Sequence, residues 1–263
     1  MRTALVLILI ASSLWVALAW LAHRSAFFPM RYPQGWWHVQ QETGAEDVWL
    51  TAADGVKLHG WWAMGKGAKI ATLFLHGNAG NVTHRGEALR GISAAGSAVL
   101  LLDYRGYGKS EGSPSESGLY RDAEAGYAWL LAKGYAESAI VLHGESLGTA
   151  VAVELASRKP CRGLVLEAPF SSARDVARSV LPGLGGVLMW GFDSASKIGK
   201  SKAPLLLIHG SDDEVIDIEL GRRLFERANE PKQMWVLPGA GHNNIVESAG
   251  AEYARRLRAF YGS

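Results

Sequence analysis

A glycine-flanked serine stands between an apolar run and a stretch of helical period. Gly144, Ser146 and Gly148 form a G-x-S-x-G pattern, which His143 separates from the apolar residues 139–142. In a strand–turn–helix context this pattern holds the serine on a sharp turn with its hydroxyl clear of the sheet, and side chains at the glycine positions would collide with backbone. The following helix would point amide hydrogens and its positive dipole end at the site. The pattern predicts nucleophilic attack on an acyl carbonyl by Ser146, although such a serine can also be an ordinary helix N-cap.

A serine hydroxyl is a poor nucleophile until a base takes its proton, and that base needs a carboxylate to orient it. His242 lies in a glycine-containing loop, residues 239–244, between the last predicted strand and the last predicted helix. A loop at this position can reach the carboxyl ends of the strands. His143 and His209 stand at strand ends beside glycines and fit the role less well. We predict that His242 is the base; a solvent-exposed loop histidine is the alternative.

Four carboxylates that follow the predicted strand 205–208 compete for the role of the acid: Asp212, Asp213, Glu214 and Asp217. A buried acid must face the histidine from just beyond the strand end, which suits Asp212 or Asp213. The other two are better placed to solvate and cap the next helix. These considerations do not separate Asp212 from Asp213. A metal site in this cluster is not expected, because no pair of histidine ligands and no calcium-loop spacing accompanies it.

The oxyanion of a tetrahedral intermediate needs hydrogen-bond donors near the serine. The predicted strand 70–75 runs into His76-Gly77-Asn78, where Gly77 allows a turn that can direct the backbone amide of Asn78 at the pocket. With the amide of Leu147, this would supply two donors. A plain glycine turn after a strand is the alternative.

These residues must be positioned by the elements around them. Apolar runs alternate with stretches of helical period, which indicates a parallel sheet covered by helices on both faces. The predicted strands of that sheet are residues 70–75, 98–102, 139–142, 163–166, 205–208 and 233–237, and the predicted helices are residues 84–95, 116–133, 147–158, 218–229 and 247–260. Strands 47–51 and 56–64, joined by an Asp-Gly turn, form an antiparallel hairpin before them. We predict an α/β fold with a mostly parallel, doubly wound sheet, in which reactive groups gather at the carboxyl ends of the strands.

Residues 170–201 interrupt this rhythm for longer than most connections in a compact domain, and we expect them to form a small cap over the site. Within the cap, residues 180–192 are strongly apolar. They could line a groove for an acyl chain, contact the surface of a bilayer, or simply pack on the core.

The N-terminal segment predicts a membrane-targeting helix. Residues 4–22 carry no charge and are long enough to cross a hydrocarbon core. We expect residues 1–24 to be a retained single-pass anchor, residues 25–46 a linker and residues 47–263 the catalytic domain. Ala17-Leu18-Ala19 resembles a signal-peptidase site, so a secreted or periplasmic protein is the alternative. The flanking charges leave the orientation open.

The composition of the chain limits the kinds of partner and cofactor that it is expected to bind. The net charge is +2 among 263 residues and no basic run stands out, so nucleic acid is not an expected partner. The single cysteine, Cys161, cannot form an internal disulfide and is expected to be structural. Gly108-Lys109-Ser110 resembles the end of a phosphate loop, but position 103 is Asp103 where that loop needs its first glycine. No nucleotide cofactor is predicted.

Taken together and in order, these motifs resemble the membrane-anchored α/β-hydrolases of the Bem46 type, from about Phe27 to the C-terminus. The matching segments are residues 76–81, 103–110, 144–148, 209–216 and 241–242. In the H-G-x-x-D-x-x-[VI] motif of that family the aspartate falls on Asp213, and the oxyanion donors fall on Asn78 and Leu147. The resemblance implies a serine hydrolase with an N-terminal anchor, no cofactor and a small or lipid-like acyl substrate.

The sequence favours hydrolysis of carboxylic esters or acyl thioesters through an acyl-enzyme on Ser146. Relatives of this type include enzymes that remove fatty acyl groups from thioesters, enzymes that act on lipids and sequences described as serine aminopeptidases. An aminopeptidase would need an acidic pocket for the substrate amine, for which Glu145 or Glu167 could serve. A non-catalytic membrane-bound binding module is the alternative from another class. The substrate and the oligomeric state stay open.

Overall fold

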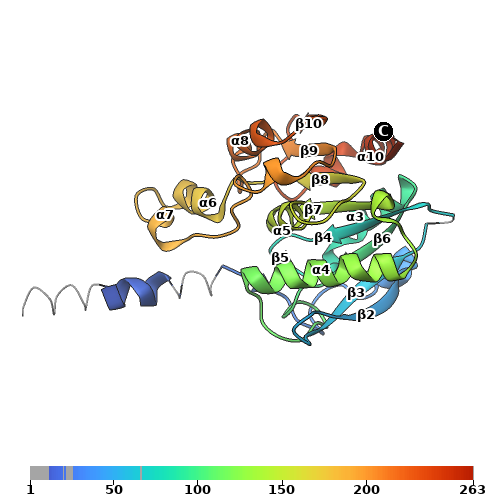
Figure 1. Cartoon of the computed structure of the whole chain (residues 1–263), viewed down its shortest axis with the longest axis horizontal. Coiled ribbons are helices and arrows are strands. Elements are labelled where there is room, and N and C mark those ends of the chain that lie inside the picture. Colours follow the sequence, from blue (N-terminus) through green and yellow to red (C-terminus); the bar gives the residue numbers. More distant parts are fainter. Residues whose placement is uncertain (1–11, 20, 22–25, 66, 263) are drawn as a thin grey trace, which may run out of the picture.

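An eight-stranded sheet runs through the centre of the protein in the order β10-β9-β8-β7-β4-β6-β3-β2 (Figure 1). The computed structural model describes residues 12–19, 21, 26–65 and 67–262. Its strands are β2 (Glu46–Thr51), β3 (Lys57–Ala63), β4 (Ile70–Leu75), β6 (Ser97–Leu102), β7 (Ile140–Glu145), β8 (Gly163–Glu167), β9 (Leu205–Gly210) and β10 (Lys232–Leu237). Six of them, from β10 to β6, pair in parallel, whereas β3 and β2 are antiparallel. The predicted mostly parallel sheet with an antiparallel N-terminal hairpin is confirmed.

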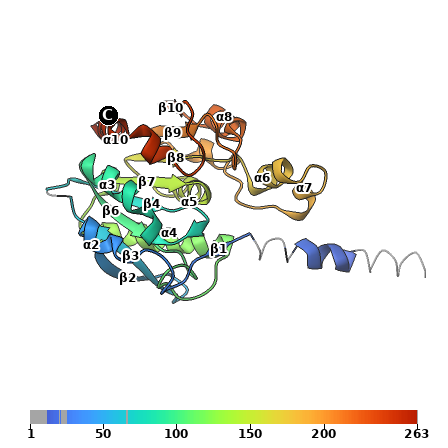
Figure 2. The same ribbon diagram turned by 180° about the vertical axis from the view of Figure 1, so that it is seen from behind.

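Helices cover both faces of this sheet (Figures 1 and 2). The longer ones are α3 (Gly86–Ala94), α4 (Glu116–Ala132), α5 (Leu147–Ala156), α8 (Ile218–Arg227) and α10 (Ala251–Gly262). The shorter ones are α2 (Val39–Thr43), α6 (Ala173–Val180), α7 (Gly185–Leu188), α9 (Ile245–Ala249) and the 3-10 turns Val82–Arg85, Glu137–Ala139 and Ile198–Lys200. Because strand side chains alternate between faces, each central strand contributes to both cores.

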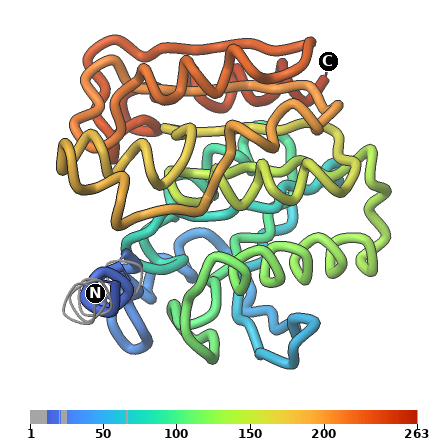
Figure 3. The backbone as a smooth tube through the Cα atoms, turned by 60° about the vertical axis from the view of Figure 1, so that its left-hand side comes forward, coloured from blue at the N-terminus to red at the C-terminus, as the bar shows by residue number. Residues whose placement is uncertain are grey.

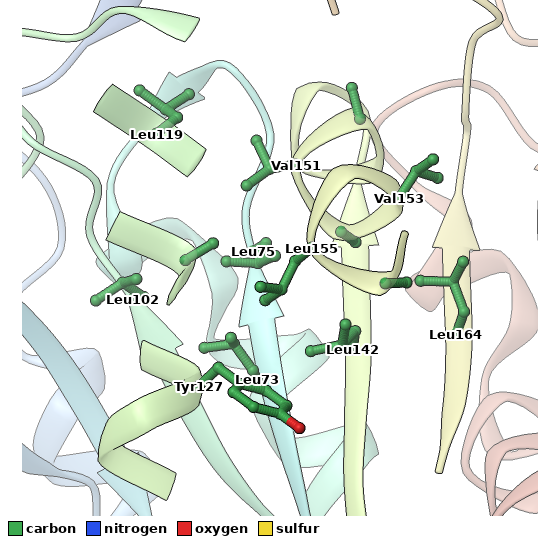
Figure 4. Packing of buried hydrophobic residues seen from close by; sticks show 14 of the residues in the cluster. Leu73, Leu75, Leu102, Leu119, Tyr127, Leu142, Val151, Val153, Leu155 and Leu164 are labelled. Carbon is green, nitrogen blue, oxygen red and sulfur yellow. The ribbon is translucent and has the colours of Figure 1, made fainter. Parts of the chain in front are cut away.

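The strand β4 illustrates this division. Leu73 and Leu75 join the cluster beneath α4 and α5, whereas Phe74 joins the cluster beneath α3 and α10. Figure 4 shows the first cluster, in which Leu75 lies near Val151 and Leu155 of α5, and Leu73 lies farther along the same strand. All of these side chains are at most 1% exposed. Burying a leucine contributes about 1.5–3 kcal/mol, so the sheet and its helices form a rigid platform for the loops at the strand ends.

Two helices differ from the sequence prediction. The helix predicted over residues 84–95 begins with the 3-10 turn Val82–Arg85 and continues as α3. The helix predicted over residues 247–260 is divided into α9 and α10 at Gly250, which has a φ of +52°. A positive φ is inexpensive only for glycine, so the chain turns there although the helical period continues on both sides.

The expected cap and the N-terminal segment lie on the same side of the protein (Figures 1 and 3). Residues 170–201 contain α6 and α7, which project beyond the sheet, and the turn Ile198–Lys200, whose Ile198 is buried in the core. Most of the predicted 4–22 helix falls outside the described residues; those that are described, 12–19 and 21, are helical. Among the described residues, no helix combines the length and the apolar character needed to span a bilayer.

The expected linker is integrated into the fold over its described part. Phe28–Pro29 forms β1, which pairs in parallel with β5 (Ala79–Gly80), and α2 lies against α3. Cys161 packs against the core beside β8, and burial raises the pKa of its thiol to about 12. A thiol with such a pKa stays protonated at neutral pH and is a weak nucleophile.

Candidate active site

Ser146 stands at the turn between β7 and α5 with a φ of +49° and a ψ of −115°. This strained conformation is held by a 2.8 Å hydrogen bond from its backbone amide to the carbonyl of Glu167 on β8. The flanking glycines are required by close packing. A Cβ atom at Gly144 would lie 2.4 Å from the carbonyl oxygen of Gly148, and one at Gly148 would lie 1.8 Å from that of Leu75. The turn therefore projects the Ser146 side chain away from the sheet.

His242 connects this serine to a buried carboxylate. Its Nε2 lies 3.0 Å from Oγ of Ser146, and its Nδ1 lies 2.8 Å from Oδ2 of Asp213. The three residues follow β7, β9 and β10 in the chain. Ser146 and His242 are 96 positions apart, and Asp213 and His242 are 29 positions apart. The imidazole is thus placed to accept the serine proton at Nε2 while Nδ1 donates to the carboxylate.

Asp213 is held by more than the histidine. Its Oδ1 accepts hydrogen bonds from the amides of Val215 and Ile216 at 2.9 and 2.7 Å, and Nε2 of His209 lies 3.2 Å from Oδ2. Burial disfavours the charged carboxylate, but the hydrogen bonds from His209 and His242 outweigh it. The pKa of Asp213 consequently lies well below its usual range, and the carboxylate is ionised at neutral pH.

The other three carboxylates of the cluster face elsewhere. Asp212 is exposed and accepts a hydrogen bond from the hydroxyl of Ser211 at 2.6 Å. Asp217 caps α8 by accepting from the amide of Glu219, as the sequence predicts. Glu214 accepts from the backbone amide of His242 at 3.3 Å, so it contacts the histidine loop instead of the next helix. Among the described residues, no group of three histidine, cysteine or carboxylate side chains is arranged to hold a metal ion.

Asn78 and Leu147 both line the cavity that contains Ser146. Leu147 is the first residue of α5, where backbone amides have no partner within the helix. The Asn78 side chain is fixed by contacts that the sequence does not reveal. Its Nδ2 donates to the carbonyl of Ala26 at 2.6 Å, and its Oδ1 accepts from the hydroxyl of Tyr107 at 3.1 Å and from the amide of Phe28 at 3.4 Å. The expected linker thus holds the loop after β4.

A cavity of about 1090 Å³ surrounds Ser146 and His242 at the carboxyl ends of the strands. Its walls come from the expected linker, the loops after the strands and the cap. Apolar side chains dominate them: Phe27, Phe28, Pro29, Leu147, Phe170, Val176, Val180, Met189, Trp190, Phe192, Val215 and Ile216. A smaller set of polar residues, including Asn78, Glu145 and His242, lines it as well, and such a mixture is usual for the binding site of a small molecule.

Comparison with known proteins agrees with this arrangement. Residues 67–197 match the family described as serine aminopeptidase, S33. An uncharacterized protein of Mycobacterium tuberculosis is 39% identical over 219 residues, which cover 81% of this chain and 78% of that protein. The α/β-hydrolase domain-containing protein 17C of Xenopus tropicalis is 36% identical over 233 residues, which cover 86% of this chain and 73% of that protein.

The chain belongs to the α/β-hydrolase family.

Among solved structures, an esterase of Pyrococcus furiosus superposes on this α/β-hydrolase with a TM-score of 0.73 at 26% identity. The superposition covers 89% of this chain and 98% of the esterase. Family membership and this neighbour make the protein a hydrolase, as the sequence predicts. The narrower assignment to the Bem46 type stays a prediction.

An ion pair beside the nucleophile was not foreseen from the sequence of this hydrolase. Nε of Arg85 lies 2.5 Å from Oε2 of Glu145, and Arg85 also donates to the carbonyl of Ala79 at 3.1 Å. Both charged side chains line the cavity. Arg85 and Glu145 are 60 positions apart, so no local pattern indicates their contact. The pair lies beside Gly77, in the loop that carries Asn78.

Glu167 lies beneath the nucleophile instead of within the cavity. It is 2% exposed, and its Oε1 is 2.7 Å from Nε2 of His143 and 2.5 Å from the hydroxyl of Tyr253. These buried groups come from β7, β8 and α10. They link the strand that carries Ser146 to its neighbour and to the C-terminal helix, so their role is to hold the platform together.

Proposed function

We propose that this α/β-hydrolase cleaves carboxylic esters or acyl thioesters through an acyl-enzyme on Ser146. The observation that carries the proposal is the hydrogen-bonded series Ser146, His242 and Asp213 at one end of a large apolar cavity. Each group has the partner that acyl transfer requires: a nucleophile beside a base, and a base beside an ionised carboxylate.

In the first half-reaction Oγ of Ser146 attacks the acyl carbonyl carbon while its proton passes to Nε2 of His242. The negative oxygen of the tetrahedral intermediate accepts from the backbone amides of Asn78 and Leu147. When the carbonyl re-forms, the bond to the alcohol or thiol breaks, and the leaving group takes the proton from His242. A water molecule then loses a proton to His242 and attacks the acyl-enzyme, releasing the carboxylic acid and restoring Ser146.

The cavity supports an acyl substrate over a peptide amine. An aminopeptidase needs a free carboxylate for the substrate ammonium group, and the two candidates that the sequence offers for that role are engaged elsewhere. Glu145 pairs with Arg85, and Glu167 is buried beneath the nucleophile with His143 and Tyr253. A third carboxylate of the cavity wall, Glu116, accepts hydrogen bonds from the hydroxyl of Tyr120 and the amide of Phe192. The apolar walls instead favour burial of hydrocarbon, at about 0.8 kcal/mol for each methylene group.

Turnover of matched substrates tests the proposal. The full-length protein is assayed with p-nitrophenyl esters of two and twelve carbons, a twelve-carbon acyl thioester and an aminoacyl p-nitroanilide. From the esters we expect either a burst of p-nitrophenol equal to the enzyme concentration or a steady release of it. From the thioester we expect a steady release of product. We also expect a fluorophosphonate to label the serine. Turnover of the anilide alone would favour the aminopeptidase. No detectable turnover of any substrate, together with no fluorophosphonate labelling, would favour a non-catalytic binding module.

The Asn78 side chain provides a narrower prediction. In Asn78→Ala the backbone amide is retained, but the contacts with Ala26, Phe28 and Tyr107 that position the loop are lost. A displacement of about 1 Å can lower turnover by about 100-fold. Because the amide would move away from the oxyanion of the intermediate, we expect kcat to fall about 10- to 100-fold with little change in KM.

The control for this variant is Tyr107→Phe, which removes one of the three contacts and should lower kcat by less than Asn78→Ala does. Circular dichroism and the thermal midpoint establish that both variants are folded. An Asn78→Ala enzyme with unchanged kcat would show that the side chain does not position the oxyanion donors.

A further inference from the structure

The cap exposes an unusually apolar surface to solvent. Residues 180–190, which we call the cap ridge, comprise the end of α6, α7 and the turns around it. Val180 is 74% exposed, Leu184 is 60% exposed and Val187 is 53% exposed, and Leu181 and Trp190 are also exposed. No charged residue occurs between Arg178 and Asp193. Contiguous large apolar side chains of this kind mark a surface that is covered in the functional state.

The described N-terminal helix exposes apolar side chains in several directions. Leu14, Trp15 and Val16 are successive and therefore point about 100° apart around the helix, yet all three are exposed. A helix that is apolar all round is suited to hydrocarbon or to a protein interior, not to water. The ring of Trp15 stacks on that of Trp190 with 5.8 Å between centroids, so the exposed apolar side chains of this helix adjoin those of the cap ridge. Figures 1 and 3 show the helix and the cap on the same side of the protein.

The cavity reaches the surface at the same place. Phe28 of the N-terminal segment and Val180 of the cap ridge both line the cavity, and they are 63% and 74% exposed. Exposed polar residues, Ser113, Ser115 and Asn243, also line the cavity. A ligand that enters on the side of Phe28 and Val180 would cross the apolar surface of the cap ridge and the N-terminal helix.

These observations favour a lipid surface as the occupant over a second copy of the chain. Residues 4–22 carry no charge, and a stretch of that length is long enough to cross a hydrocarbon core. The described part of this stretch adjoins the cap ridge. Trp15 and Trp190 have the amphipathic rings that gather at headgroup level. Arg174, exposed on the helix that leads into the ridge, is suited to contact with lipid phosphates.

We propose that the cap ridge inserts into the surface of a phospholipid bilayer and opens the cavity toward acyl chains held there. The docking itself is independent of the enzyme's chemistry. The delivery of acyl substrates from the bilayer rests on the proposed acyl hydrolase function.

Site-specific fluorescence tests the docking without any assay of activity. In full-length protein carrying Cys161→Ser, a polarity-sensitive nitrobenzoxadiazole label is placed at Leu184→Cys. The matched control carries the label at Met64→Cys, which is 75% exposed just after β3. With phosphatidylcholine and phosphatidylglycerol vesicles, we expect a blue shift and quenching by doxyl lipids at position 184 and neither at position 64.

Two outcomes would overturn the docking. One is a label at position 184 that stays in water while the protein sediments with the vesicles. The other is a blue shift at position 184 that needs no vesicles and grows with protein concentration, which would assign the ridge to a contact between copies of the chain.

A second experiment tests delivery. Leu184→Asp combined with Val187→Asp changes two ridge residues outside the cavity lining. We expect at least a 10-fold loss in hydrolysis of a long-chain acyl ester embedded in vesicles, with unchanged hydrolysis of the soluble two-carbon ester. Equal rates on the embedded ester in both proteins would refute delivery. If neither protein hydrolyses any ester, the proposed function fails, and the fluorescence result still decides the docking.

Discussion

Replacing Ser146 by alanine is expected to lower kcat for ester substrates by about a million-fold. The loss is large because the variant has no atom that can form the acyl-enzyme, so the remaining rate depends on water within the cavity. His242 loses its contact at 3.0 Å, but its link to Asp213 persists, and the strained turn is held by backbone contacts that alanine keeps. The fold should therefore survive the substitution.

The measurement is burst and steady-state release of p-nitrophenol, accompanied by fluorophosphonate labelling. Ser113→Ala is a matched control, because Ser113 lines the same cavity but lies on the loop after β6. We expect that control to retain its activity and its labelling within a few-fold. If Ser146→Ala keeps a tenth or more of the wild-type kcat, Ser146 is not the nucleophile and the proposed mechanism is wrong.

The parts of the site that can be predicted from the sequence are those that depend on residue types at a fixed spacing within one short segment. Gly144 and Gly148 are needed because backbone occupies the space beside them, so the chemistry of the turn leaves a pattern around Ser146. The parallel sheet was similarly readable, because strands buried on both faces are continuously apolar. The predicted strand boundaries differ from the observed ones by at most three residues, and β7 extends to Glu145, next to the nucleophile.

Contacts between distant segments left no such pattern. Residue type and position could not separate Asp212 from Asp213, and only the family resemblance favoured Asp213. The structure supplies a physical distinction: the Asp213 carboxylate turns inward to His242 and to backbone amides, whereas Asp212 is exposed. The pairing of Arg85 with Glu145 and the contact of Asn78 with Ala26 likewise depend on how the whole chain folds.

Replacing Asp213 by asparagine is expected to lower kcat by about 10,000-fold. The asparagine oxygen can still accept from the amides of Val215 and Ile216, so the loop after β9 should keep its shape. However, its amide group offers a donor toward Nδ1 of His242, which favours the tautomer with the proton on Nε2. That nitrogen then cannot accept the proton of Ser146, and the charge that would stabilise the imidazolium is gone.

Asp212→Asn is the matched control, since it removes the adjacent, exposed carboxylate and should change kcat by less than about two-fold.

The pH dependence of stability separates the two aspartates further. Because the pKa of Asp213 is lowered by folding, the unfolded chain binds the proton more tightly between the two pKa values, and stability falls as pH decreases below about 4. Above that pH the stabilising effect is fully present. The thermal midpoint of Asp213→Asn should therefore decline less steeply under acid than those of wild type and Asp212→Asn, and parallel declines in all three would mean that Asp213 carries no such charge.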